Sequence, residues 1–189
     1  MNSKILLAGI GGQGVLFAHQ LLAECAIAQE LNVTGAETHG MSQRGGSVVS
    51  HLKIGDSVAP LIRQGTADFI LAFDASESYR NISFIRRGGT VVVNNSLSDY
   101  PTPRLLEQLA SMSVSLRVLD ADGIARALGR ISASNVTLIG FASTCKGFPL
   151  STEMLRETVA RVAPERYREV NLKAFEEGVK AGAAKYETI

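Results

Sequence analysis

The stretch KILLAGIGGQG, residues 4–14, decides the fold of this chain. Residues 4–10 form a short apolar run of strand length, and the glycines that follow supply a tight turn. A long amphipathic segment comes next, in which one apolar face recurs with the helical period, at Val15, Ala18, Leu22, Cys25 and Ala26. The stretch therefore predicts a strand, a glycine turn and a helix that packs back onto the strand.

The glycines of this turn also suit a ligand. Gly9, Gly11 and Gly14 satisfy the pattern G-x-G-x-x-G in the strand–turn–helix setting that it requires. A helix that begins there presents free amides and a partial positive charge, which favour phosphate. Gly12 and Gln13 join these three glycines as candidate cofactor-binding residues. The same glycines can instead serve only the tight turn and close helix–strand packing.

A dinucleotide-binding domain would also need an acidic residue at the end of its second strand. Glu37 closes the strand-like run 33–37 at about the right distance, which keeps a free-standing NAD(P)-binding dehydrogenase as an alternative. Glu37 leads straight into a glycine-rich loop, however, whereas a nicotinamide domain normally continues into a helix and a third parallel strand. The continuation fits that alternative poorly.

A second glycine-rich segment, THGMSQRGGS at residues 38–47, lies between two strand-like runs and is named the arginine loop here. Its glycines allow positive φ and close backbone approach, and Arg44 adds a planar guanidinium suited to carboxylate or phosphate. An anionic ligand is therefore expected, although an ordinary turn with a solvent-facing arginine is the alternative. The candidate binding residues are His39, Ser42, Gln43, Arg44, Gly45 and Gly46.

Composition excludes several classes of protein. The chain has 189 residues, of which 46% are hydrophobic and 20% charged, enough for one globular core. A net charge of +1, with scattered basic residues, argues against nucleic-acid binding. Cys25 and Cys145 are the only cysteines, so no iron–sulfur, zinc or other metal site is expected. No signal-like or bilayer-length apolar run occurs, so we expect a cytoplasmic protein without membrane contact.

Strand-like and helical segments alternate through the rest of the chain. Further strands are predicted over 48–54, 67–73, 90–93 and 114–119. Helix caps are predicted at Asp74, Asp122, Asn135 and Ser151. Asn94 and Asn95 are expected in a loop. Pro164 opens a last helix, whose small residues Gly178, Ala181 and Gly182 suit close packing against the sheet or a partner.

No repeat or linker divides the chain, so residues 1–189 are predicted to form a single domain. The alternation of elements predicts an α/β fold with three layers, α/β/α, around a Rossmann-like, mostly parallel or mixed sheet.

The chain carries few groups for independent catalysis. His19 falls on the apolar side of the first helix and His51 in an alternating strand, where buried, hydrogen-bonded histidines are common. Only His39 lies in a suspected site. No nucleophile elbow, metal-spaced cluster or Walker loop occurs. No residue is therefore assigned as catalytic in the chain alone, and Arg44 is the candidate ligand or active-site anchor.

Three stretches together resemble the gamma-type subunits of 2-oxoacid:ferredoxin oxidoreductases: residues 9–14, the segment from Glu37 to Gly46, and the helix start from Asn135 to Gly140. The match spans nearly the whole chain. Within this family the arginine loop is most similar to the beta subunits of indolepyruvate:ferredoxin oxidoreductases. Gln43 stands where relatives acting on pyruvate or 2-oxoglutarate tend to carry glutamate.

The resemblance implies one subunit of a hetero-oligomer that is inactive alone. In this family thiamine diphosphate on the larger subunit attacks a 2-oxoacid, electrons pass through iron–sulfur clusters to ferredoxin, and coenzyme A takes the acyl group. This chain lacks cluster-spaced cysteines, and Asn94 and Asn95 lack the upstream Gly-Asp-Gly of a thiamine diphosphate–magnesium motif. Thiamine diphosphate, magnesium and iron–sulfur clusters are thus expected on the partner.

The expected role of this chain is to complete the active site for oxidative decarboxylation of an arylpyruvate such as indolepyruvate to acyl-CoA, on the coenzyme A side. Coenzyme A would then lie in a site shared with the larger subunit, which holds thiamine diphosphate and the iron–sulfur clusters. Ferredoxin would be reached only through the complex. A purely structural partner subunit is a further alternative.

Overall fold

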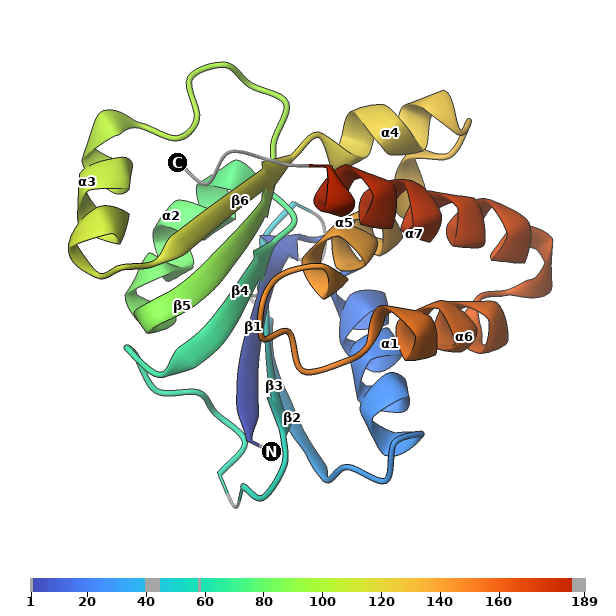
Figure 1. The fold of residues 1–189 in the computed structure, drawn as a ribbon, viewed down its shortest axis with the longest axis horizontal. Helices are drawn as coiled ribbons and strands as arrows, with labels where there is room; N and C mark the ends of the chain where they lie inside the picture. Colours follow the sequence, from blue (N-terminus) through green and yellow to red (C-terminus); the bar gives the residue numbers. More distant parts are fainter. Residues whose placement is uncertain (1, 40–44, 58, 185–189) are drawn as a thin grey trace.

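The structure, a computed structural model, describes residues 2–39, 45–57 and 59–184 (Figure 1). Its centre is a six-stranded sheet in the order β2-β3-β1-β4-β5-β6. Four neighbouring strands run parallel, namely β1 (Ser3–Ile10), β4 (Ala67–Ala72), β5 (Ile85–Asn94) and β6 (Ser115–Leu119). The hairpin of β2 (Val33–His39) and β3 (Ser47–Ile54) joins them through antiparallel pairing of β3 with β1. The sheet is therefore mixed, within the predicted α/β class.

Helices cover both faces of the sheet, which gives the predicted three layers (Figure 1). One face carries α1 (Val15–Ile27), α4 (Ala121–Ala127), α5 (Ser134–Ser143), α6 (Thr152–Val162) and α7 (Arg168–Ala183). The other carries α2 (Ala75–Asn81) and α3 (Pro103–Ser111). Short 3-10 helices, Ile82–Phe84, Ile131–Ala133 and Glu165–Tyr167, precede β5, α5 and α7. Among the described helices, none has the length and apolarity to cross a bilayer.

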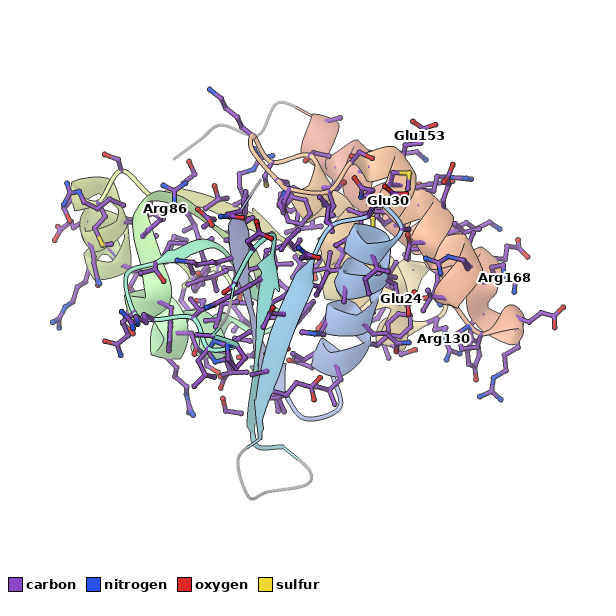
Figure 2. The ribbon with its side chains drawn as sticks, turned by 90° about the horizontal axis from the view of Figure 1, so that it is seen from below. Glu24, Glu30, Arg86, Arg130, Glu153 and Arg168 are labelled. Atoms are coloured by element: carbon purple, nitrogen blue, oxygen red, sulfur yellow. The ribbon has the colours of Figure 1, made fainter. Side chains whose placement is uncertain are left out.

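Two hydrophobic cores follow from the alternation of side chains along the strands. In β1, Ile5 and Leu7 pack with α1 and α5, whereas Leu6 packs with the α3 side of the sheet. All five residues of the apolar face predicted for α1 are buried. Charged side chains such as Glu24, Glu153 and Arg168 instead lie on the outside of the helical layer (Figure 2).

The helical face is two helices deep at one place, because α5 is buried beneath α7. Every residue from Asn135 to Ala142 is buried. The two helices approach closely at glycines: a Cβ at Gly178 would strike the carbonyl of Thr137, and a Cβ at Gly140 would strike that of Phe175. Of the small residues predicted to meet the sheet or a partner, Gly178 therefore meets α5 and Gly182 meets Thr144, just after α5.

Two predicted caps are confirmed and two are wrong. Asp74 accepts a hydrogen bond from the amide of Ser76, and Ser151 accepts one from Met154. The cap of α4 is Asp120 rather than Asp122, since Asp120 accepts from the amide of Gly123 over 2.7 Å. Asn135 does not cap α5. It lies inside the helix, which begins one residue earlier.

Candidate functional site

The carboxyl ends of β1, β4, β5 and β6 lie at one edge of the sheet because these strands run parallel. The chain leaves β1 for α1 on one face and leaves β4 for α2 on the other (Figure 1). The edge between β1 and β4 is therefore the topological switch point, where open α/β sheets bind their ligands. The end of β2 and the start of β3 lie at the same edge and extend beyond the start of α1 (Figure 2).

A cleft of about 320 Å³ opens at this switch point. Gln13 lines it from the glycine turn, and residues 73–76 and 94–97 line it from the segments that follow β4 and β5. Most of the lining residues are polar, including Asp74, Ser76 and Asp122. The candidate cofactor-binding residue Gln13 thus lies on the wall of a polar cleft.

Packing and backbone conformation explain two of the predicted glycines, Gly9 and Gly14, whereas Gly11 has only an ordinary contact. A Cβ at Gly9 would lie 2.8 Å from Cγ2 of Val15 and 3.2 Å from Cβ of Phe73, so Gly9 allows α1 to approach the sheet. Gly14 precedes α1 at a φ of 74°, and its carbonyl accepts a hydrogen bond from Nδ2 of Asn135 over 3.2 Å. Gly11 faces the arginine loop, where a Cβ would lie 3.4 Å from the amide nitrogen of Gly45.

Gly12 differs from its neighbours because it faces open space. Its φ is 103°, and a Cβ there would meet nothing within 4 Å. Gln13 secures the turn beneath it: its Oε1 accepts from the amide of Ile10 over 2.8 Å, and its own amide donates to the carbonyl of Ile10 over 3.0 Å. The surface of the turn at Gly12 is therefore both fixed and accessible to a ligand.

The structure brings the two predicted glycine segments together. The amide of Gly11 donates to the carbonyl of Gly46 over 2.9 Å, and Gly45 has a φ of 82°. His39 ends β2 with its backbone opposite Val48. The remaining candidates, Ser42, Gln43 and Arg44, lie outside the described residues, so their roles stay predictions.

A buried acidic residue behind the arginine loop escaped sequence reasoning. Glu77 follows the cap Asp74 by three positions, which is the spacing of a helix-start signature, but it is 2% exposed and accepts a hydrogen bond from the hydroxyl of Ser47 over 2.6 Å. The spacing of Asp74 and Glu77 does not show whether the Glu77 carboxylate bonds back to the start of its own helix or to another element. The hydrogen bond from Ser47 at the start of β3 distinguishes the two cases.

Asn94 also takes a place that its sequence did not indicate. Asn94 was expected in a loop, but it is the last residue of β5 and is buried. Its Nδ2 donates to Oδ1 of Asp122 over 2.9 Å and to the carbonyl of Phe73 over 3.2 Å, while its Oδ1 accepts from the amide of Ala121 over 3.0 Å. Asn94 therefore links β4, β5 and α4 at the floor of the cleft.

Both described histidine side chains have structural surroundings, as predicted. Nδ1 of His19 lies 2.6 Å from the hydroxyl of Ser50, and Nδ1 of His51 accepts from the amide of Ile62 over 3.2 Å. Burial lowers the pKa of both imidazoles below 6.5, and the charge of Glu37 opposes this for His19. They are therefore neutral, hydrogen-bonded groups away from the cleft.

The described residues contain no group of three or more His, Cys, Asp or Glu side chains that could hold a metal ion. Cys25 and Cys145 are both free and buried, and burial raises the pKa of each thiol.

Comparison with known proteins supplies the context of this site. Residues 4–181 match the family model "Pyruvate ferredoxin/flavodoxin oxidoreductase". The indolepyruvate oxidoreductase subunit IorB of Thermococcus kodakarensis is 36% identical over 191 residues, which cover 94% of this chain and 95% of that subunit.

Two solved structures share the fold. The gamma subunit of a keto/oxoacid ferredoxin oxidoreductase from Geobacter sulfurreducens, 24% identical, superposes with a TM-score of 0.78 over 96% of this chain and 99% of its own. A 2-oxoglutarate:ferredoxin oxidoreductase from Magnetococcus marinus, solved with 2-oxoglutarate, coenzyme A and succinyl-CoA, is 21% identical. It has a TM-score of 0.79, over 99% of this chain but 32% of that longer chain.

Proposed function

Since this chain belongs to the pyruvate ferredoxin/flavodoxin oxidoreductase family, we propose that it is the non-cluster subunit of a 2-oxoacid:ferredoxin oxidoreductase that acts on an arylpyruvate such as indolepyruvate. The observation that carries the proposal is the 36% identity to an indolepyruvate oxidoreductase subunit along nearly the full length of both chains. Residues 1–189 then form one gamma-type domain of the complex. The larger subunit supplies thiamine diphosphate, magnesium and the iron–sulfur clusters, and passes electrons to ferredoxin.

The carboxyl edge of the sheet is the face that this proposal assigns to the active site. There the glycine turn, the end of the arginine loop and the polar cleft adjoin one another. The guanidinium of Arg44 would bind an anionic group, either of a ligand or of the larger subunit. This chain would thus contribute binding and orientation, while the partner carries the redox chemistry.

Coenzyme A fits this edge of the chain. Its phosphates need backbone amides that a side chain does not obstruct, and the turn at Gly12 faces open space at the start of α1. Gly12, Gln13 and the arginine loop would hold it, and its thiol supplies the group that accepts the acyl product.

Thiamine diphosphate with magnesium does not fit Asn94. The side chain of this residue is fully engaged by Phe73, Ala121 and Asp122, and a metal would have to displace those partners. Its place on the larger subunit agrees with this arrangement.

The placement of Glu37 weighs against a free-standing dehydrogenase. Glu37 lies in β2, and β3 separates this strand from β1. Neighbouring strands are about 4.8 Å apart, so an acid at the end of β2 is one strand further from the glycine turn than a dinucleotide-binding domain places it.

Reconstitution tests the proposal. The purified chain should be colourless and should not decarboxylate indolepyruvate with any electron acceptor, whereas addition of the purified larger subunit should give coenzyme A-dependent turnover. Robust activity of this chain alone would refute the proposal. If the larger subunit turns over indolepyruvate equally well with and without this chain, this chain would instead be a purely structural partner.

A further inference from the structure

A buried carboxylate, Glu77 of α2, lies directly behind the end of the arginine loop. The residue is 2% exposed, and its Oε2 accepts a hydrogen bond from the hydroxyl of Ser47 over 2.6 Å. Ser47 is both the last residue of the arginine loop and the first residue of β3. This bond therefore connects the hairpin of β2 and β3 to α2. That helix lies on the face of the sheet opposite α1.

The described residues offer this carboxylate only weak alternatives. Nδ2 of Asn81 lies 3.4 Å from the same oxygen, and Nε of Arg80 lies 3.6 Å from the other, with the Arg80 side chain 68% exposed. Burial of a carboxylate is costly unless it is paired, and neutral side chains often serve packing equally well. The hydrogen bond from Ser47 is therefore the shortest described contact of the Glu77 carboxylate.

Gly46, the neighbour of Ser47, is held from a second direction. Its carbonyl accepts the amide hydrogen bond of Gly11 over 2.9 Å, and the strand pairing places Ser47 opposite Ile10. Two consecutive residues at the end of the arginine loop are thus anchored, one through its backbone to the glycine turn and one through its side chain to α2. Arg44 precedes the first of them by two positions.

We propose that Ser47 and Glu77 are positioning residues, which hold Gly46 against the glycine turn and so keep this part of the carboxyl edge in the form that binds an anionic group of the larger subunit or its ligand. The inference rests on the proposed function of the arginine loop. Ordering a segment during binding costs free energy, so a loop that is anchored beforehand binds its partner more tightly.

Three serine variants of the full chain, each assembled with the larger subunit, test this inference. Ser47→Ala removes the hydroxyl and Ser47→Thr keeps it. Ser78→Ala is the matched control, because Ser78 lies next to Glu77 on α2 and is 1% exposed. Its hydroxyl bonds to the hydroxyl of Tyr100 over 2.9 Å rather than to the arginine loop. The readouts are amide hydrogen exchange at Gly11, the dissociation constant of the complex, and kcat and KM for the 2-oxoacid and coenzyme A.

Ser47→Ala should speed exchange at Gly11 and weaken either assembly or a KM by about tenfold, the scale for a lost hydrogen bond to a charged group. Ser47→Thr should stay within about twofold of wild type by the same reasoning. Ser78→Ala should lower thermal stability without either effect. Unchanged exchange at Gly11 in Ser47→Ala would overturn the inference, as would faster exchange with wild-type assembly and kinetics.

Arg44→Ala, measured in parallel, separates the inference from the proposed function. If Arg44→Ala impairs assembly or turnover and Ser47→Ala does not, the positioning role fails and the function of the arginine loop stands. If Arg44→Ala behaves as wild type, the function of the loop fails and the positioning role fails with it.

Discussion

The amide of Gly11 donates to the carbonyl of Gly46 over 2.9 Å. Through this bond, two segments that are separate in sequence become one continuous surface at the carboxyl edge of the sheet. Neighbouring glycines of the turn differ in their surroundings: Gly11 faces the backbone of the arginine loop, whereas Gly12 has a positive φ and faces open space. Substitutions at neighbouring positions of the turn therefore test different properties.

Gly12→Ala tests the turn as a ligand site. A side chain at a φ of 103° is strained, so the free energy of unfolding should fall by about 1 to 2 kcal/mol. Gly65 is the matched control, since it has a φ of 70°, faces open space and precedes β4 at the opposite edge of the sheet. Gly12→Ala alone should slow the coenzyme A-dependent half-reaction more than decarboxylation. An equal loss in both half-reactions, with dissociation of the complex, would show that Gly12 is architectural.

Arg44 should be irreplaceable by lysine if it binds a carboxylate or phosphate away from water. Arg44→Ala should then cost about 2 to 5 kcal/mol in assembly or transition-state binding, the scale for breaking a buried charge pair. Arg44→Lys should fail to restore it, because an ammonium cannot make a planar two-point contact. Kinetics and the assembly constant of the reconstituted complex provide the measurement. A solvent-facing arginine would cost less than about 1 kcal/mol and tolerate lysine.

The same substitution should destabilise the fold far more at Asn94 than at Asn95. Asn94→Asp places a carboxylate against the Asp122 oxygen and the carbonyl of Phe73, and should destabilise the fold by about 3 kcal/mol or more. Asn95 is only partly buried and donates to the carbonyl of Leu97, so Asn95→Asp should cost less than about 1 kcal/mol. Urea denaturation of both variants measures the difference, and similar midpoints would mean that Asn94 does not link the floor of the cleft.

Stability should fall on mild acidification. Burial lowers the pKa values of His19 and His51 below the 6.5 of an unperturbed imidazole, so the unfolded chain binds more protons than the folded one below that pH. The free energy of unfolding is then fully retained above about pH 6.5 and decreases as the pH falls through the lowered folded-state values. His19→Gln should reduce this slope in urea denaturation between pH 5 and 7.5. An unchanged slope would assign the effect to other groups.

Local signals in the sequence predicted much of the fold. The face of α1 and the caps Asp74 and Ser151 depend on residues a few positions apart, and all are confirmed. The choice between Asp120 and Asp122 depends on where β6 ends, which short-range preferences leave uncertain by one or two residues. The sequence could not distinguish the buried Asn94 from the loop residue Asn95. Asn94 is held by hydrogen bonds to Phe73 and Asp122, which are distant in sequence.

The candidate site was predicted in parts but not as a whole. Both glycine segments were found from composition and spacing, yet their contact depends on the position of β3 beside β1. Sheet order is set by tertiary pairing and has no periodic signature in the chain. The roles of Glu77 and Ser47 depend on the same pairing, so they emerged only from the structure.

The hydrogen bond from Asn135 to the carbonyl of Gly14 joins residues 121 positions apart, and this separation has a consequence for synthesis. All strands of the sheet are made once Leu119 has been added, because translation proceeds from the N-terminus. The turn before α1 therefore gains its amide partner only when α5 is made, after every strand of the sheet.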